Sequence, residues 1–215
     1  MPTLEELVLV VQDTLQEEDI STDFIVRRLN EGLEYCARDV RLPNLESYGT
    51  FITTLGSYYT DIPADWNYGR SLYSAELDSD TLIEIASSVS QIKHASIINT
   101  VEQGQIEYLT VVGNKLFYYP SPSTQTTVLC RFYKKPETLV SDTDQVVSLP
   151  ESFASSILEN YALWKCYKII EDEQEGQRVN TRHYRAAFFD DLQLLDDHIN
   201  EGQSRPAPIR YNSWI

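Results

Sequence analysis

The segment 108–133 restricts the fold of this chain more than any other part of its sequence. Two runs of β-branched and aromatic residues flank Gly113 and Asn114, two residue types that tolerate positive φ, and this pattern predicts a β-hairpin. Pro120 and Pro122 end the second strand, because proline cannot donate a hydrogen bond to a strand ladder. A third strand is expected over 126–133, so the middle of the chain should contain a compact β unit.

Helical periodicity replaces the strand pattern toward both ends of the chain. Apolar residues recur every three or four positions in four segments, and each segment predicts an amphipathic helix. Ser21 or Thr22 can cap the second helix, Pro43 ends it, and Pro150 suits the first position of the third, where a missing N–H costs nothing. Brief connections predict two antiparallel helical hairpins. The four segments are residues 3–16, 22–42, 150–170 and 177–200.

Between these helical parts, residues 48–147 carry strand and turn signals. The segment 82–93 fits either a short helix or a strand with a turn. A loop rich in Asp, Ser and Thr, 141–148, then leads back to helix. The other predicted strands cover residues 50–55, 57–62 and 68–77, and the strand pattern resumes near Ile106.

None of the four predicted helices can bury its apolar stripe alone. We therefore expect an α+β fold: an antiparallel four-helix bundle assembled from the N- and C-terminal helical hairpins, with an inserted antiparallel β domain and an extended C-terminal tail. The expected domains are a discontinuous helical bundle of residues 1–46 plus 148–201, a β-rich insert of 47–147, and a tail of 202–215.

The formal net charge of -16 argues against affinity for nucleic acid, which depends on Lys and Arg replacing phosphate counterions. No apolar run approaches the roughly 18 residues of a membrane span, and the N-terminus does not resemble a secretory signal. Cys36, Cys130 and Cys166 are odd in number and far apart, which favours reduced, structural thiols in a protein that folds in the cytoplasm.

The sequence offers few groups for catalysis. His94, His183 and His198 lack partners at metal-ligand spacing, and no nucleophile elbow, P-loop or dinucleotide-binding motif is present. Adjacent carboxylates such as Asp190 and Asp191 point to different faces of a helix, so we interpret them as a solvated surface. We predict no catalytic, cofactor-binding or metal-binding residue.

The C-terminal tail is the predicted partner interface. Most of the 14 tyrosines and 3 tryptophans should pack strands and helices, but large aromatic residues on a proline-containing terminus are typical of interface anchors. Folding back onto the same chain is the alternative. The predicted interface residues are Arg205, Pro206, Pro208, Ile209, Arg210, Tyr211, Trp214 and Ile215.

The order of helical hairpin, aromatic β insert and helical hairpin resembles the head-to-tail adaptor proteins of tailed bacteriophages. Several short segments are similar to that family: the proline–aspartate turn at 62–66, the hairpin and Pro-x-Pro exit at 108–122, the strand exit at 133–139, and the third helix at 149–151 and 161–163. The resemblance covers residues 3–200, and it is weakest over 82–103.

The resemblance implies a structural virion protein without enzymatic activity. Such adaptors form rings, here expected to hold twelve identical subunits, that bind beneath the portal protein and provide the attachment platform for tail, stopper or nozzle proteins. DNA would pass through the channel without sequence-specific binding, and the acidic composition fits a channel wall that repels phosphate. The expected location is the head–tail junction of the virion, after folding in the bacterial host cytoplasm, without membrane contact.

Three other functions remain open from the sequence alone. A different neck or tail-completion ring would share the acidic channel. A tail-associated cell-wall hydrolase would need a cleft with two opposed carboxylates. A carbohydrate-binding module could use the tyrosines of the β insert as a sugar platform.

Overall fold

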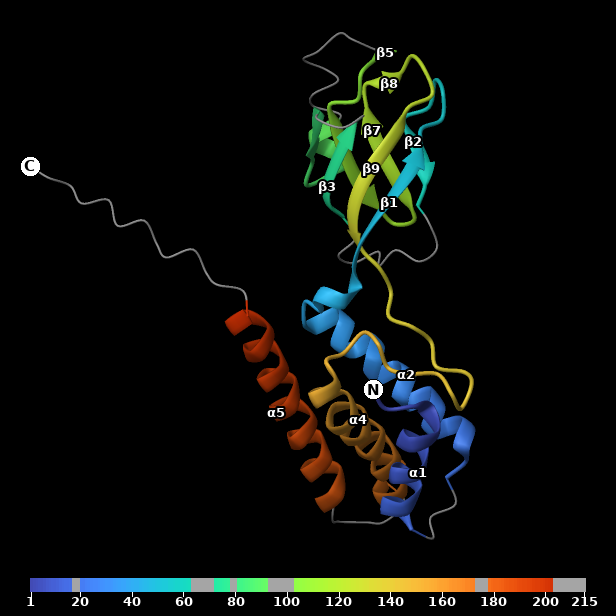
Figure 1. Ribbon diagram of the computed structural model, residues 1–215, viewed down its shortest axis with the longest axis vertical. Helices are drawn as coiled ribbons and strands as arrows, with labels where there is room; N and C mark the ends of the chain where they lie inside the picture. Colours follow the sequence, from blue (N-terminus) through green and yellow to red (C-terminus); the bar gives the residue numbers. More distant parts are fainter. Residues whose placement is uncertain (17–19, 63–71, 78–80, 93–102, 173–177, 203–215) are drawn as a thin grey trace, which may run out of the picture. The chain divides into compact units, whose positions relative to one another are not determined.

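A computed structural model describes residues 1–16, 20–62, 72–77, 81–92, 103–172 and 178–202 of the chain. The chain divides into two compact units (Figure 1). The helical unit comprises Met1–Pro43 and Glu137–Ile215, and the β unit comprises Asn44–Pro136.

Helix α4 is the centre of the helical unit. Helices α1, α2 and α5 all pack against it, and the pairs α1–α2 and α4–α5 each run in opposite directions (Figure 1). Tyr161, Ala162 and Leu163 of α4 are consecutive and all buried, so this helix is covered on several sides. The helices are α1 (Leu4–Leu15), α2 (Thr22–Asp39), α4 (Glu151–Asp172) and α5 (Val179–Gly202).

Side chains cap the N-terminal ends of α1 and α2. Thr3 and Glu6 form a capping box, in which each side chain accepts a hydrogen bond from the backbone N–H of the other residue. The Ser21 hydroxyl accepts from the Phe24 N–H, so Ser21 is the cap of α2. The predicted buried stripe of α1 is confirmed, and it consists of Leu4, Leu7, Val8, Val11 and Leu15.

A buried carboxylate joins the end of α4 to the start of α5. Glu171 accepts hydrogen bonds from the backbone N–H groups of Asn180 (2.9 Å) and Thr181 (3.0 Å). Burial raises the pKa of this carboxyl, but these hydrogen bonds and the charge of Arg178 outweigh burial, so the pKa lies below its usual value. The ionised carboxylate therefore caps α5, whose own first turn contains no acidic residue.

The predicted loop 141–148 is attached to the start of α1. The Leu4 N–H donates to the Asp144 carbonyl (2.9 Å), and the Val146 N–H donates to the Pro2 carbonyl (3.1 Å). The Asn30 side chain of α2 holds the preceding segment, because it exchanges two hydrogen bonds with the Leu139 backbone (2.9 and 2.8 Å). These hydrogen bonds hold the segment 139–146 against the helical unit, where the chain comes back from the β unit.

The β unit is built on one seven-stranded sheet with the strand order β1-β9-β3-β4-β6-β7-β2. Neighbouring strands are antiparallel except β4 and β6, which are parallel, so the sheet is mixed. The strands are β1 (Glu46–Ile52), β2 (Tyr59–Asp61), β3 (Leu72–Leu77), β4 (Thr81–Ile85), β6 (Tyr108–Val112), β7 (Lys115–Tyr119) and β9 (Thr127–Tyr133); the short parallel pair β5 (Gln103–Gly104) and β8 (Ser121–Pro122) is separate, and the 3-10 helix η1 (Pro43–Leu45) precedes β1.

The predicted hairpin is confirmed as β6 and β7, which pair over five positions. Gly113 supplies the positive φ of its turn, at 59°. The predicted third strand is β9, but it does not extend this hairpin. Instead it pairs with β1 on one side and β3 on the other.

The sheet curls so that its two ends approach each other around one core. Phe51 of β1 and Tyr118 of β7 stack with their ring centroids 6.4 Å apart. The Tyr118 hydroxyl accepts from the Thr54 N–H (3.0 Å) and donates to the Tyr59 carbonyl (3.1 Å), so the buried phenol is satisfied by both ends of the sheet. The core also contains Ile62, Ala75, Leu77, Ile83, Ile106, Leu109, Leu116, Val128, Cys130 and Phe132.

The predicted architecture, an antiparallel four-helix bundle with an inserted antiparallel β domain, is wrong. The chain is α+β, with five helices in its described part and a large, curled, seven-stranded mixed sheet. The sheet is larger and mixed because the segment left open in the sequence supplies β4, which pairs in parallel with β6 through Glu84 and Tyr108. The helices differ because α4 is buried on several sides, whereas a simple bundle gives each helix one buried stripe.

Gly49 permits a close contact inside the β unit, and its substitution should be destabilising. A Cβ atom at this position would lie 2.8 Å from Cε1 of Phe132, a buried ring on the paired strand β9. We expect Gly49→Ala to lower the free energy of unfolding by about 1–3 kcal/mol through overpacking. Urea denaturation followed by circular dichroism would measure this loss. Thr50→Ala, at the adjacent exposed position, is the matched control and should change little; equal stability of both variants would contradict the contact.

The Glu171 cap should make the stability of the helical unit depend on pH. Because the pKa of this carboxyl in the folded protein lies below the ordinary glutamate value of 4.5, the carboxylate stabilises the fold above that pH, and the contribution is lost as the pH falls through the folded pKa. We expect Glu171→Gln to lower the free energy of unfolding by about 1 kcal/mol at neutral pH, with the difference shrinking in acid. Thermal melts between neutral and acidic pH would test this. Glu34→Gln, at an exposed position of α2, should show no such trend.

Candidate interaction surfaces

The three cysteines are free and buried in the cores of the two units. Burial, with a smaller contribution from Asp39, raises the pKa of the Cys36 thiol to about 12, and burial raises that of Cys130 to about 12. Burial also raises the pKa of Cys166 to about 11, although the charge of Arg28 opposes it. These thiols stay protonated near neutral pH, as expected for structural rather than nucleophilic cysteines.

The two histidines in the described part of the chain lie on α5, and each contacts an aromatic ring. His183 lies 5.0 Å from the Tyr184 ring, and His198 lies 5.3 Å from the Phe153 ring, measured between centroids. Within the described ranges, no group of three or more His, Cys, Asp or Glu residues is arranged to hold a metal ion. Of the described helices, none is both long and apolar enough to cross a membrane.

An aromatic cluster lies where α2, α4 and α5 meet. The Trp164 ring of α4 lies 6.0 Å from the rings of both Phe188 and Phe189 of α5. Tyr35 of α2 contacts the same two phenylalanines at 5.3 and 6.1 Å, and it contacts Tyr161 of α4 at 6.0 Å. Phe188 and Tyr161 are buried, whereas Phe189 is 37 % exposed, so the cluster reaches the surface.

Cations surround the exposed side of this cluster. The Lys165 Nζ lies 3.7 Å from the Trp164 ring centroid, and the Arg185 Cζ lies 5.8 Å from the same centroid. Burial, followed by the like charges of Lys168, Arg28 and Arg185, lowers the pKa of Lys165, although Glu31 opposes this shift. None of the residues Lys165, Lys168 and Arg185 forms a salt bridge with another described residue.

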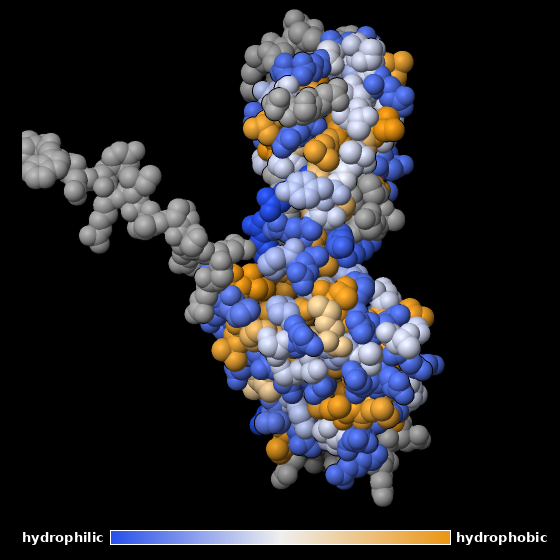
Figure 2. Space-filling model, in the orientation of Figure 1, coloured by the Kyte–Doolittle hydropathy of each residue, from blue (hydrophilic) through white to orange (hydrophobic). Residues whose placement is uncertain are grey.

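We call Trp164, Lys165, Lys168, Arg185 and Phe189 the cationic–aromatic face. Positive charge is concentrated here although the whole chain has a net charge of -16. Figure 2 shows hydrophobic residues lying among hydrophilic ones on the visible face of the helical unit. A surface with unpaired cations and partly exposed aromatic rings suits a protein partner that carries carboxylates.

The β unit exposes apolar residues on the outer face of its sheet. Strand register places Thr50 opposite Leu129, Leu129 opposite Glu76, and Glu76 opposite Leu82, so one row crosses four strands. Leu129 and Leu82 are 41 % and 73 % exposed. Tyr48 and Ile52 of β1 are also exposed on this face, which makes it a second candidate contact surface.

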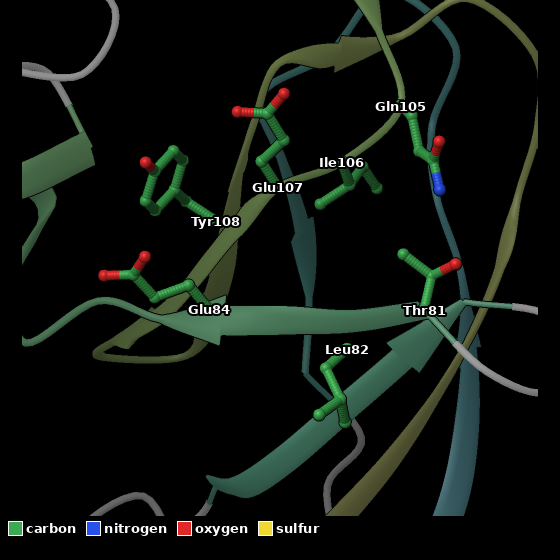
Figure 3. Close-up of a pocket in the computed structure, with 7 residues that line it drawn as sticks. All are labelled: Thr81, Leu82, Glu84, Gln105, Ile106, Glu107 and Tyr108. Atoms are coloured by element: carbon green, nitrogen blue, oxygen red, sulfur yellow. The ribbon is translucent and has the colours of Figure 1, made fainter.

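A shallow pocket opens where β4 and the segment before β6 diverge. Its volume is about 330 Å³, and Figure 3 shows Glu84, Glu107 and Tyr108 grouped at one side of it. The Glu84 N–H donates to the Glu107 carbonyl (2.8 Å), where the parallel pairing begins. Both glutamate side chains are exposed, whereas the general acid of a glycosidase is typically desolvated. The pocket therefore offers two solvated carboxylates rather than an acid–base pair.

The predicted interface residues Arg205, Pro206, Pro208, Ile209, Arg210, Tyr211, Trp214 and Ile215 lie outside the described residues, as do His94 and most of the 62–66 segment. The cationic–aromatic face was not predicted. Helical periodicity places Lys165 and Ile169 with the apolar positions of the predicted helix 150–170, yet Ile169 is 42 % exposed. In α1, by contrast, the unbroken apolar run 7–11 is longer than one helix face can bury, so the sequence does indicate that part of this helix stays exposed.

Comparison with known protein families gives a match that spans nearly the whole chain. The sequence model of a family described as SU10 adaptor protein matches residues 2–211. No curated protein matches the sequence.

Proposed function

This chain belongs to the SU10 adaptor protein family, so it is a phage adaptor protein, and we propose that it forms a ring beneath the portal at the head–tail junction. In this proposal twelve subunits surround the DNA channel, bind the portal above, and provide the attachment platform for tail, stopper or nozzle proteins below. The observation that carries the proposal is the family match over residues 2–211, which includes both units.

The charge of the chain supports a channel through which DNA passes without being bound. With 33 acidic residues against 17 Lys and Arg, a ring of these subunits would carry a large negative charge. Such a wall repels the phosphates of DNA, so DNA can slide through the channel without being retained there. The three free, buried thiols are compatible with folding in the bacterial host cytoplasm before incorporation into the virion.

We propose that the C-terminal tail grips the portal or an adjacent subunit. Residues 203–215 carry Arg205 and Arg210 but no acidic side chain, and they end in Tyr211, Trp214 and Ile215. Arginines can pair with carboxylates of the partner, and the aromatic side chains can fill pockets on it.

Ring formation should depend on the portal. Because the portal would supply the template, we expect the purified protein to be monomeric or weakly associated and to form a ring of twelve when portal is added. Mass photometry of the protein with and without portal would measure both states. A closed ring of another order in the particle, or no association with portal, would contradict the proposal.

Truncation after Gly202 should separate folding from assembly. The tail lies beyond the last described helix, so we expect its removal to leave the melting temperature nearly unchanged and to abolish incorporation into particles. Differential scanning calorimetry and quantification of the adaptor in purified particles would test the two halves of this prediction. Normal incorporation of the truncated protein would show that docking relies on other surfaces.

A further inference from the structure

Helix α1 exposes apolar residues that its own unit does not bury. Leu9 and Val10 are 51 % and 42 % exposed, although the residues on either side of the pair are buried. Exposed carboxylates flank them: Glu5 and Asp13 lie four residues before and after Leu9, and Glu6 lies four before Val10. This spacing places all five side chains on one surface of the helix, which we call the acidic–apolar face. None of the three carboxylates forms a salt bridge within the described chain, although one oxygen of Glu6 accepts the capping hydrogen bond from the Thr3 N–H.

The cationic–aromatic face has the complementary character, and it lies elsewhere on the helical unit. Its residues come from α4 and α5, and the charged groups that act on Lys165 come from α2, α4 and α5 rather than α1. Figure 1 shows α1 and α5 on different sides of α4. Each face therefore combines apolar side chains with unpaired charge, but the two faces carry opposite signs.

We propose that the acidic–apolar face of one subunit docks on the cationic–aromatic face of the next copy of this chain. The proposal rests on the ring put forward above and identifies its lateral contact. Two different, complementary faces on one subunit make a heterologous contact, and such contacts generate a closed ring when the rotation closes. Face-to-face pairing of identical surfaces would oppose like charges, which disfavours a two-fold dimer.

The contact combines burial with charge pairing. Leu9 and Val10 can cover the edge of the Phe189 and Trp164 rings, which removes apolar surface of both subunits from water. Glu5, Glu6 and Asp13 can then pair with Lys165, Lys168 and Arg185, so that three carboxylates meet three cations. Assembly of the ring should accordingly weaken as the salt concentration rises.

Charge reversal tests the contact on portal-assembled rings. The acidic-face variant carries Glu5→Lys and Asp13→Lys, and the cationic-face variant carries Lys168→Glu and Arg185→Glu; all four positions are exposed. We expect each variant alone to assemble on the portal about tenfold more weakly than wild type, because every lateral contact becomes repulsive. A control with Arg27→Glu and Glu34→Lys changes two exposed charges of α2 and should assemble normally.

Mixing the two variants should restore assembly, because alternating subunits in a ring of even order would again oppose unlike charges at every contact. A single chain that carries all four reversals should be restored for the same reason. Circular dichroism of each variant confirms folding beforehand. If both variants assemble like wild type, or if mixing gives no rescue, the proposed contact is wrong although the ring itself stands. If the wild-type chain forms no ring on the portal, both proposals fail.

Cysteine crosslinking gives the direction of the contact. Val10→Cys and Ala186→Cys place exposed thiols on α1 and beside the cationic–aromatic face, while the native cysteines are buried. With a short bismaleimide, rings mixed from the two variants should yield crosslinked dimers, and rings of either variant alone should not. Crosslinks within Val10→Cys rings, or none in mixed rings, would overturn the heterologous arrangement.

Discussion

Burial of α4 is the constraint on which the helical unit depends. Three other helices pack on it, and residues two positions apart, such as Tyr161 and Leu163, are buried on different sides of the same turn. A helix that is apolar around most of its circumference cannot remain folded in water by itself. Its partners α1 and α2 come from the other end of the sequence, so the N- and C-terminal parts must associate before either is stable. The Glu171 carboxylate adds a polar requirement, because it is buried and must be matched by the N–H groups of α5.

The β unit can lie between the two helical segments in the sequence without preventing their association, because its first and last strands pair with each other. Strand β1 enters the unit and β9 leaves it, and the two strands pair from Glu46 with Tyr133 to Ile52 with Thr127. The Lys134 N–H extends this pairing by donating to the Leu45 carbonyl at 2.9 Å. An insertion whose entry and exit strands are hydrogen-bonded neighbours imposes little loop-closure entropy on the host unit.

The sequence predicts features that depend on residues close together in the chain. It does not predict which distant segments pair with one another. The stripe of α1, the Ser21 cap and the turn at Gly113 are local patterns, and each could be predicted. The partners of β9 could not, because several apolar strands offer equivalent edges and the pairing joins residues far apart in sequence. The candidate faces were missed for a related reason: a run such as 7–11 contains more than one apolar row, and periodicity does not say which row stays exposed.

Burial of Cys36, Cys130 and Cys166 has a consequence for the life of a particle outside the cell. A virion leaves a reducing cytoplasm and persists in air-saturated surroundings, where exposed thiols form disulfides or advance along the sulfur oxidation series. Thiols that are sealed in a core and held in the protonated form react slowly on both routes. The same subunit can therefore pass between the two redox environments without a change in covalent structure. This property suits a virion protein, because a subunit damaged by oxidation outside the cell cannot be exchanged for a new one.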